Sequence, residues 1–122
     1  MNPLIEKFVS CAICCGYCID SGRAQLFDEI GPDLCRFRDK ILAVGVAGVA
    51  SLRELLAPDN SHWVRYFASE VLIQELPDDA ISTLKELQKI DGLVALSSEV
   101  ALSFHAKKLL DRKRAARSDE SP

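Results

Sequence analysis

Residues Leu52 to Leu72 read LRELLAPDNSHWVRYFASEVL and contain the clearest helical pattern of the chain. The leucines of this stretch recur at spacings of three and four residues, which predicts one apolar face of a helix. The turn-forming run Pro58 to Ser61 follows and ends in a residue that caps helix starts. A second segment with helical spacing comes after it. The stretch therefore predicts two helices joined by a short turn.

This helix pair occurs twice. Residues 51–55 read SLREL and residues 83–87 read TLKEL, while the SEV at 69–71 returns at 98–100. The offsets are 32 and 29, so the second unit has a turn that is three residues shorter. Stacked helix pairs of this length are typical of an α-solenoid. We therefore expect two helical pairs over residues 47–115, with helices at about 47–57, 61–76, 78–90 and 93–115.

Residues 1–46 are predicted to form capping helices against the first pair. Asn2 and Pro3 indicate a helix start, and Ser21 and Gly22 indicate its end. Apolar residues keep helical spacing from 23 to 44, but Gly31-Pro32 predicts a break inside that segment.

The whole pattern predicts an all-α protein. No run alternates as a strand would. We expect a short right-handed α-α superhelix of about six helices, forming a single domain over residues 1–117 with a disordered tail at 118–122.

The charge is distributed unevenly along the chain. Of its 122 residues, 1–106 hold 9 basic and 15 acidic side chains, whereas 107–122 hold 6 and 3. An acidic body argues against broad contact with nucleic acid and predicts that a partner steered by charge is basic. The basic run suits a helix C-terminus, and contact with RNA or a membrane is the alternative.

Four cysteines form the motif C-x2-C-C-x2-C at Cys11, Cys14, Cys15 and Cys18. One continuous helix separates its ends by about 10 Å, too far for four thiolates to meet on one ion. We therefore expect the cysteines on or beside the apolar face, with Cys35 also facing the core. The alternative is a metal- or redox-responsive site that uses a broken helix or a second subunit.

Cysteine usage and hydropathy bear on location. An odd number of clustered cysteines suits a reduced cytoplasm better than a disulfide scaffold. The longest uncharged run, 8–19, is about half the length of a membrane-spanning helix. We predict a cytoplasmic protein without a membrane partner.

No set of residues suggests catalysis. His62 and His105 are not spaced for a metal site or a relay, and no Gly-x-Ser-x-Gly or phosphate-binding loop occurs. We expect neither enzyme activity nor a cofactor.

Two groups of residues have predicted roles. Asp59 and Arg65 are expected to form a structural ion pair within the first helix pair. Trp63 is predicted either to pack in the core or to anchor an interface. In the second case it would belong to a partner-binding surface made of His62, Trp63, Tyr66, Glu70, Asp78 and Asp79.

The stretch LRELLAPDNSHWVRYFASEVL resembles a HEAT repeat, with leucines on its first helix, Asp59 in the turn, and Val64-Arg65 followed by small residues. Over the whole chain, the order LIEKFV, RAQLFDEI, LLAPDNSHWVRYFA and PDDAISTL resembles a small family of bacterial HEAT-like domains of uncharacterised function. Ser97 and Ser98 depart from the HEAT pattern in the second repeat.

This resemblance implies a non-catalytic protein-binding module. Because some such proteins resemble immunity proteins of polymorphic toxins, it also implies an immunity-type role. Together with the acidic body, this predicts a basic toxin as the partner. The open ends of a short solenoid would allow a homodimer. A redox-responsive regulator and a nucleic-acid adaptor are the alternative functions.

Overall fold

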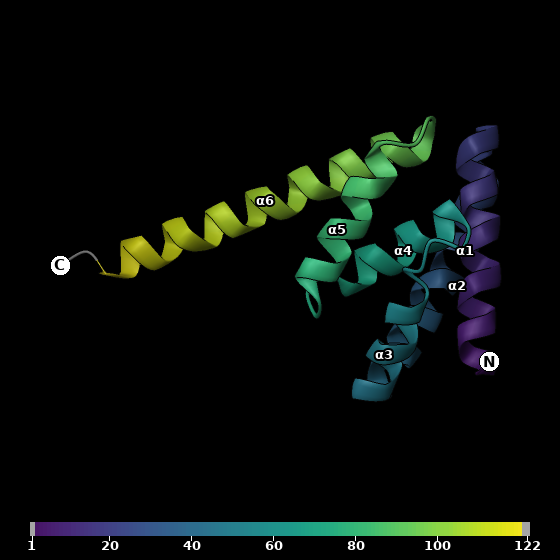
Figure 1. Cartoon of the computed structure of the whole chain (residues 1–122), viewed down its shortest axis with the longest axis horizontal. Helices are drawn as coiled ribbons and strands as arrows, with labels where there is room; N and C mark the ends of the chain where they lie inside the picture. Colours follow the sequence, from purple (N-terminus) through teal and green to yellow (C-terminus); the bar gives the residue numbers. More distant parts are fainter. Residues whose placement is uncertain (1, 121–122) are drawn as a thin grey trace.

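The computed structural model describes residues 2–120, which form helices and no strand. The six helices follow one another along the chain as drawn in Figure 1. Their bounds are α1 (Pro3–Ser21), α2 (Ala24–Ala43), α3 (Val46–Glu54), α4 (His62–Leu72), α5 (Pro77–Gln88) and α6 (Leu93–Glu120). The prediction of an all-α protein with about six helices is confirmed.

The first helix begins and ends where its caps predict. The side chain of Asn2 accepts a hydrogen bond of 2.8 Å from the Leu4 amide, and Pro3 is the first helical residue. At the other end, Gly22 takes the left-handed conformation with φ 70°, which a residue with a side chain rarely adopts.

The predicted break at Gly31-Pro32 is wrong, because α2 runs through Pro32 without interruption. An internal proline costs a helix about 3 kcal/mol and one hydrogen bond, here the bond that the carbonyl of Asp28 would accept. Helix α2 packs along α1, with Leu34 and Ile41 buried. The apolar surface that this packing removes from water outweighs the local cost.

The repeat seen in the sequence recurs in the packing. Leu52 and Leu84 occupy equivalent places and are both fully buried. Ser69 and Ser98 are also fully buried, and their hydroxyls donate to the carbonyls of Arg65 and Val94 at 2.7 and 2.8 Å. These matched positions are thus alike in burial and hydrogen bonding, and the equivalence of the pairs α3–α4 and α5–α6 as repeated units stays a prediction. The right-handed course of a superhelix stays a prediction.

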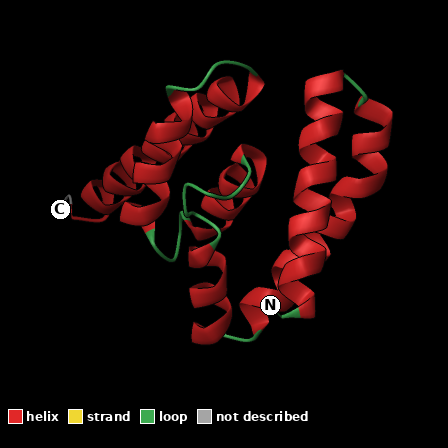
Figure 2. Ribbon diagram, turned by 45° about the vertical axis from the view of Figure 1, so that its right-hand side comes forward, coloured by secondary structure: helices red, strands yellow, loops and turns green. Residues whose placement is uncertain are grey.

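Helix α4 lies between the two halves of the protein. Figure 2 shows the α1–α2 hairpin upright on one side and α5 and α6 on the other. Helix α4 contacts α1, α3, α5 and α6, and each of its residues from Trp63 to Ser69 is buried. The core of the protein is therefore built around this helix.

The last helix continues beyond the body. Figure 1 shows the C-terminal half of α6 extending away from the other helices, and side chains 106–117 are all exposed. The helix reaches Glu120, three residues into the predicted tail, and 121–122 lie outside the described residues. Within the described part of the chain, α6 and the other helices are too short or too polar to cross a membrane.

Candidate partner-binding groove

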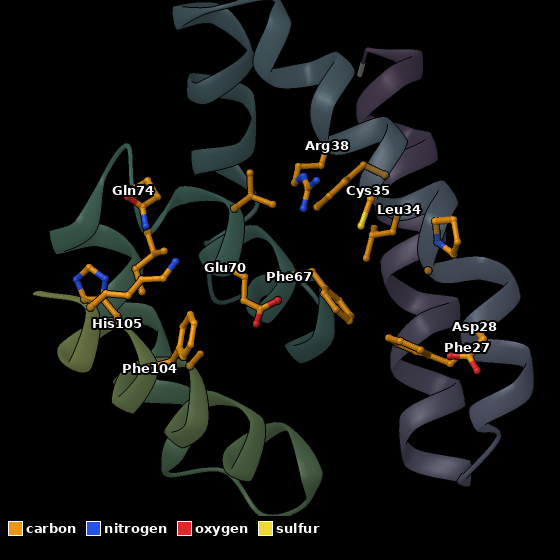
Figure 3. Close-up of a pocket in the computed structure, with 17 residues that line it drawn as sticks. Phe27, Asp28, Leu34, Cys35, Arg38, Phe67, Glu70, Gln74, Phe104 and His105 are labelled. Atoms are coloured by element: carbon orange, nitrogen blue, oxygen red, sulfur yellow. The ribbon is translucent and has the colours of Figure 1, made fainter. Parts of the chain in front are cut away.

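A groove of about 710 Å³ opens between the two halves of the protein. Figure 3 shows α2 on one side of it and α4 and α6 on the other, with Phe27, Phe67 and Phe104 around the space. We call it the central groove. Its apolar lining consists of Phe8, Phe27, Leu34, Phe67, Val71, Ile73, Ala101 and Phe104.

The two long cations of the central groove already have partners. Arg38 on α2 donates from Nε to Asp39 at 2.9 Å, and this bond, with a smaller contribution from Glu70, raises the pKa of the guanidinium. The ammonium of Lys108 lies 4.8 Å from the centre of the Phe104 ring, within the range of a cation–π contact.

The two carboxylates of the groove are less engaged. One oxygen of Glu70 accepts a hydrogen bond of 2.7 Å from the Tyr66 hydroxyl. Burial and the adjacent Glu70 carboxylate raise the pKa of Tyr66, so this hydroxyl remains a donor. Asp28 forms no ion pair among the described residues. The groove therefore offers acceptor oxygens to a cationic ligand.

Trp63 takes the core role of the two that were predicted for it. It is only 8% exposed, and its indole N–H donates to Asp20 on α1 at 2.8 Å. Gly16 allows this contact, because a Cβ atom there would lie 2.2 Å from the Trp63 ring. Trp63 thus joins α4 to α1 and is not available as an exposed interface anchor.

The other residues of the predicted partner surface do not lie on one face. The Tyr66 ring is buried beside Trp63, while His62 lines a separate hollow of about 440 Å³ at the helix turns. Asp79 pairs with Arg53 at 3.1 Å, and Asp78 is exposed at the start of α5. Of the predicted set, only Glu70 lines the central groove.

The predicted Asp59–Arg65 pair is wrong. The buried guanidinium of Arg65 donates from Nε to the Leu56 carbonyl at 2.9 Å and forms an ion pair with Glu86 of α5. Its fork therefore ties the first helix pair to the second, whereas Asp59 lines the small hollow beside His62. The repeat offset places Val94 at the position of the second unit that corresponds to Arg65. A valine side chain cannot form such polar contacts.

The cysteines divide between the core and the surface. Cys15 and Cys18 are buried as predicted, Cys11 is half-buried and Cys14 is exposed. Cys35 was expected in the core but is exposed and lines the groove, because α2 continues through Pro32 and presents this face there. Burial raises the pKa of Cys15 to about 11, which disfavours a reactive thiolate. The described residues contain no cluster of three or more metal-binding side chains.

Sequence reasoning missed most of the groove. Its α6 wall consists of Ala101, Phe104, His105 and Lys108. Phe104 ends an exposed apolar series at three- and four-residue spacing on that helix. A second apolar face on one helix is the signal that could have revealed it, because packing on α5 needs only one. The series consists of Leu93, Leu96, Val100 and Phe104, of which only Phe104 lines the groove.

The central groove thus combines aromatic surface with unpaired carboxylate oxygens, a combination that suits an apolar ligand carrying positive charge. Comparison of the chain with family models, with curated proteins and with solved structures finds no match.

Proposed function

We propose that the chain is a non-catalytic protein-binding module whose central groove holds an apolar, positively charged helical segment of a partner protein. The observation that carries this proposal is that the cations of the groove have partners within the chain, whereas its carboxylates have free oxygens. The groove cations are engaged within the chain, by Asp39 and by the Phe104 ring, while Asp28 and one oxygen of Glu70 are open to a ligand.

The size and lining of the groove favour a helix as the occupant. Phe104 is 59% exposed, so a ligand that covers this ring removes apolar surface from water. Amphipathic helices bind in apolar grooves through side chains spaced three and four residues apart. A lysine or arginine beside that apolar face would meet Glu70 or Asp28 at the rim.

The charge of the rest of the body supports a basic partner. Residues 1–106 carry a net charge of −6, which attracts a cationic protein over a distance of about 10 Å at moderate salt. Electrostatic attraction of this kind raises the association rate and selects against acidic competitors.

The finer form of the proposal is an immunity-type role against a basic toxin, in a protein of HEAT-like construction. It rests on the resemblance of residues 52–72 to a HEAT repeat and on the acidic body. In this form the chain would block the toxin by covering a basic surface of it.

The first test is calorimetric titration with two synthetic amphipathic helices that share one apolar face. One peptide carries lysines beside that face and the other carries glutamates. We expect the lysine peptide to bind and the glutamate peptide not to bind. Phe104→Ser and Glu70→Lys should each weaken the lysine peptide by at least about tenfold, because they remove apolar contact and reverse a rim charge.

Leu96→Ser is the matched control, because Leu96 lies on the same helix, is also 59% exposed and does not line the groove. Glu70→Gln keeps an acceptor for the Tyr66 hydroxyl and isolates the loss of charge. Equal affinity for both peptides, or full affinity in Phe104→Ser, would contradict the proposal.

The immunity-type role needs a second experiment. The wild-type chain and Phe104→Ser serve as parallel baits in the native host, and proteins retained by the wild type alone are purified. We expect a basic protein whose toxic activity falls when an equimolar amount of the wild-type chain is added. A retained protein without such an activity would remove the toxin form and leave the binding module.

A further inference from the structure

The C-terminal arm, residues 106–117 of α6, is a helix without a surface to pack on. All of its side chains are exposed, including Leu109 at 43% and Leu110 at 49%. An isolated helix of this length is marginal in water, even with good helix formers. Two adjacent leucines on such an arm indicate a surface that becomes covered.

The arm and the body that holds the central groove have opposite net charges. The arm carries six basic side chains and one acidic side chain, whereas the body that contains the groove has a net charge of −6. The groove is lined by apolar side chains, by the carboxylates of Asp28 and Glu70, and by Arg38 and Lys108, whose charged groups already have contacts within the chain. Arm and groove are therefore complementary both in charge and in apolar character.

The arm cannot fill the groove of its own chain. Ala101, Phe104 and Lys108 of α6 form one wall of the groove, and the same helix then continues away from the body (Figures 1 and 3). Leu109 and Leu110 follow this wall directly. Only an arm from another molecule can lie against the opposite wall.

We propose that the arm of one copy occupies the central groove of a second copy, and the reverse, in a symmetric dimer. If the two α6 helices pair antiparallel near Phe104 and Lys108, each pair of leucines reaches the groove of the other copy. Such a contact uses the same patch on both molecules and closes on itself. It uses the groove of the proposed function, so a basic partner has to displace the arm.

The first measurement is the mass in solution of the full chain by sedimentation. We expect a dimer whose dissociation constant rises at least about tenfold between about 0.05 M and about 0.5 M salt, because the contact is partly ionic. The double variant Leu109→Asp, Leu110→Asp should be a monomer with unchanged helical circular dichroism. A monomeric wild-type chain at low salt would overturn the inference.

Mixing two variants shows which surfaces meet. Asp28→Lys with Glu70→Lys damages the groove and leaves the arm intact, while the leucine variant does the opposite. Each should be monomeric alone, and their mixture should give a heterodimer in native mass spectrometry through one intact contact. The control Glu29→Lys changes a neighbouring exposed acid outside the groove and should stay dimeric. No heterodimer in the mixture would refute arm exchange.

The peptide titration separates this inference from the proposed function when it is run on the monomeric leucine variant. Peptide binding there, together with a monomeric wild type, would remove the dimer and keep the binding module. A dimer disrupted by the leucine changes, together with no peptide binding, would keep the arm exchange and remove the proposed basic helical partner.

Discussion

The two ends of α4 are built in opposite ways. At its start, Trp63 fills the space above Gly16 and donates to Asp20, so the joint with α1 is tightly packed and its polar atoms are satisfied. Toward its end, Phe67, Glu70 and Val71 line the central groove, where apolar surface is left without a covering element. One helix of eleven residues therefore serves both the core and the candidate site.

We expect the start of α4 to serve stability and the exposed groove residues to serve the proposed binding, with Phe67 contributing to both the core and the groove lining. A substitution at the start of α4 should lower the free energy of unfolding and leave ligand binding in the groove unchanged. A substitution at an exposed groove residue should weaken ligand binding and leave the free energy of unfolding nearly unchanged.

The largest effect is expected at Trp63. Trp63→Ala leaves a cavity between α4 and α1 and removes the partner of Asp20, so the free energy of unfolding should fall by about 3–5 kcal/mol. Phe104→Ala removes an aromatic ring from the groove wall on α6 and should change the free energy of unfolding by about 0.5 kcal/mol or less. Urea denaturation followed by circular dichroism measures both. Similar losses at the two positions would show that the groove is part of the core.

A smaller loss is expected at the polar link between the two helix pairs. Arg65→Met keeps much of the side-chain volume but leaves the buried Leu56 carbonyl without its donor, which should cost about 2–3 kcal/mol. Glu86→Gln should cost less than about 1 kcal/mol, because Glu86 is 57% exposed and solvent screens the charge. The same denaturation assay compares the pair. Equal losses would mean that the ion pair, and not the carbonyl bond, holds the link.

The smallest effect is a dependence of stability on pH from Cys15. Burial raises its pKa in the folded state from an ordinary value of 9.0 to about 11. Its contribution to stability is therefore complete below pH 9 and is lost as the pH rises toward 11, by at most about 1.4 kcal/mol per pH unit. Cys15→Ala should make the decline between pH 9 and 10 shallower, and burial of Cys11, which also raises the pKa of that thiol, accounts for part of the remainder.

Above that range the raised pKa of Tyr66 adds a further decline that persists in the variant. The exposed Cys14 and Cys35 should react with a thiol reagent well before Cys15. An unchanged curve in Cys15→Ala would assign the whole decline to other groups.

The helices were predictable because their signals are local. Asn2-Pro3, Gly22 and the turn before His62 mark boundaries through capping and backbone preference, which act within a few residues. The exception is Pro32, where packing against α1 overrides a local cost. Such contacts join residues far apart in the chain, so the sequence around Pro32 does not reveal them.

The candidate site was much less predictable. Glu70 was predicted to bind a partner and lines the groove, but Phe27, Asp28 and Phe104 came to line one groove only when the two halves of the protein met across α4. The sequence singled out Trp63 as a large aromatic residue. Its residue type did not assign its role, because a tryptophan can serve a core or an interface equally well. The absence of a Cβ atom at Gly16, on another helix, decides between them.

The joint between Trp63 and Asp20 also gives the protein a built-in optical probe. The chain contains a single tryptophan, so all of its indole emission reports on the contact of α4 with α1. Opening of that contact would expose the indole to water and shift the emission to longer wavelength. Occupation of the central groove, which Trp63 does not line, should leave the colour of the emission unchanged. The fluorescence of Trp63 can thus distinguish ligand binding in the groove from opening of the contact between α4 and α1.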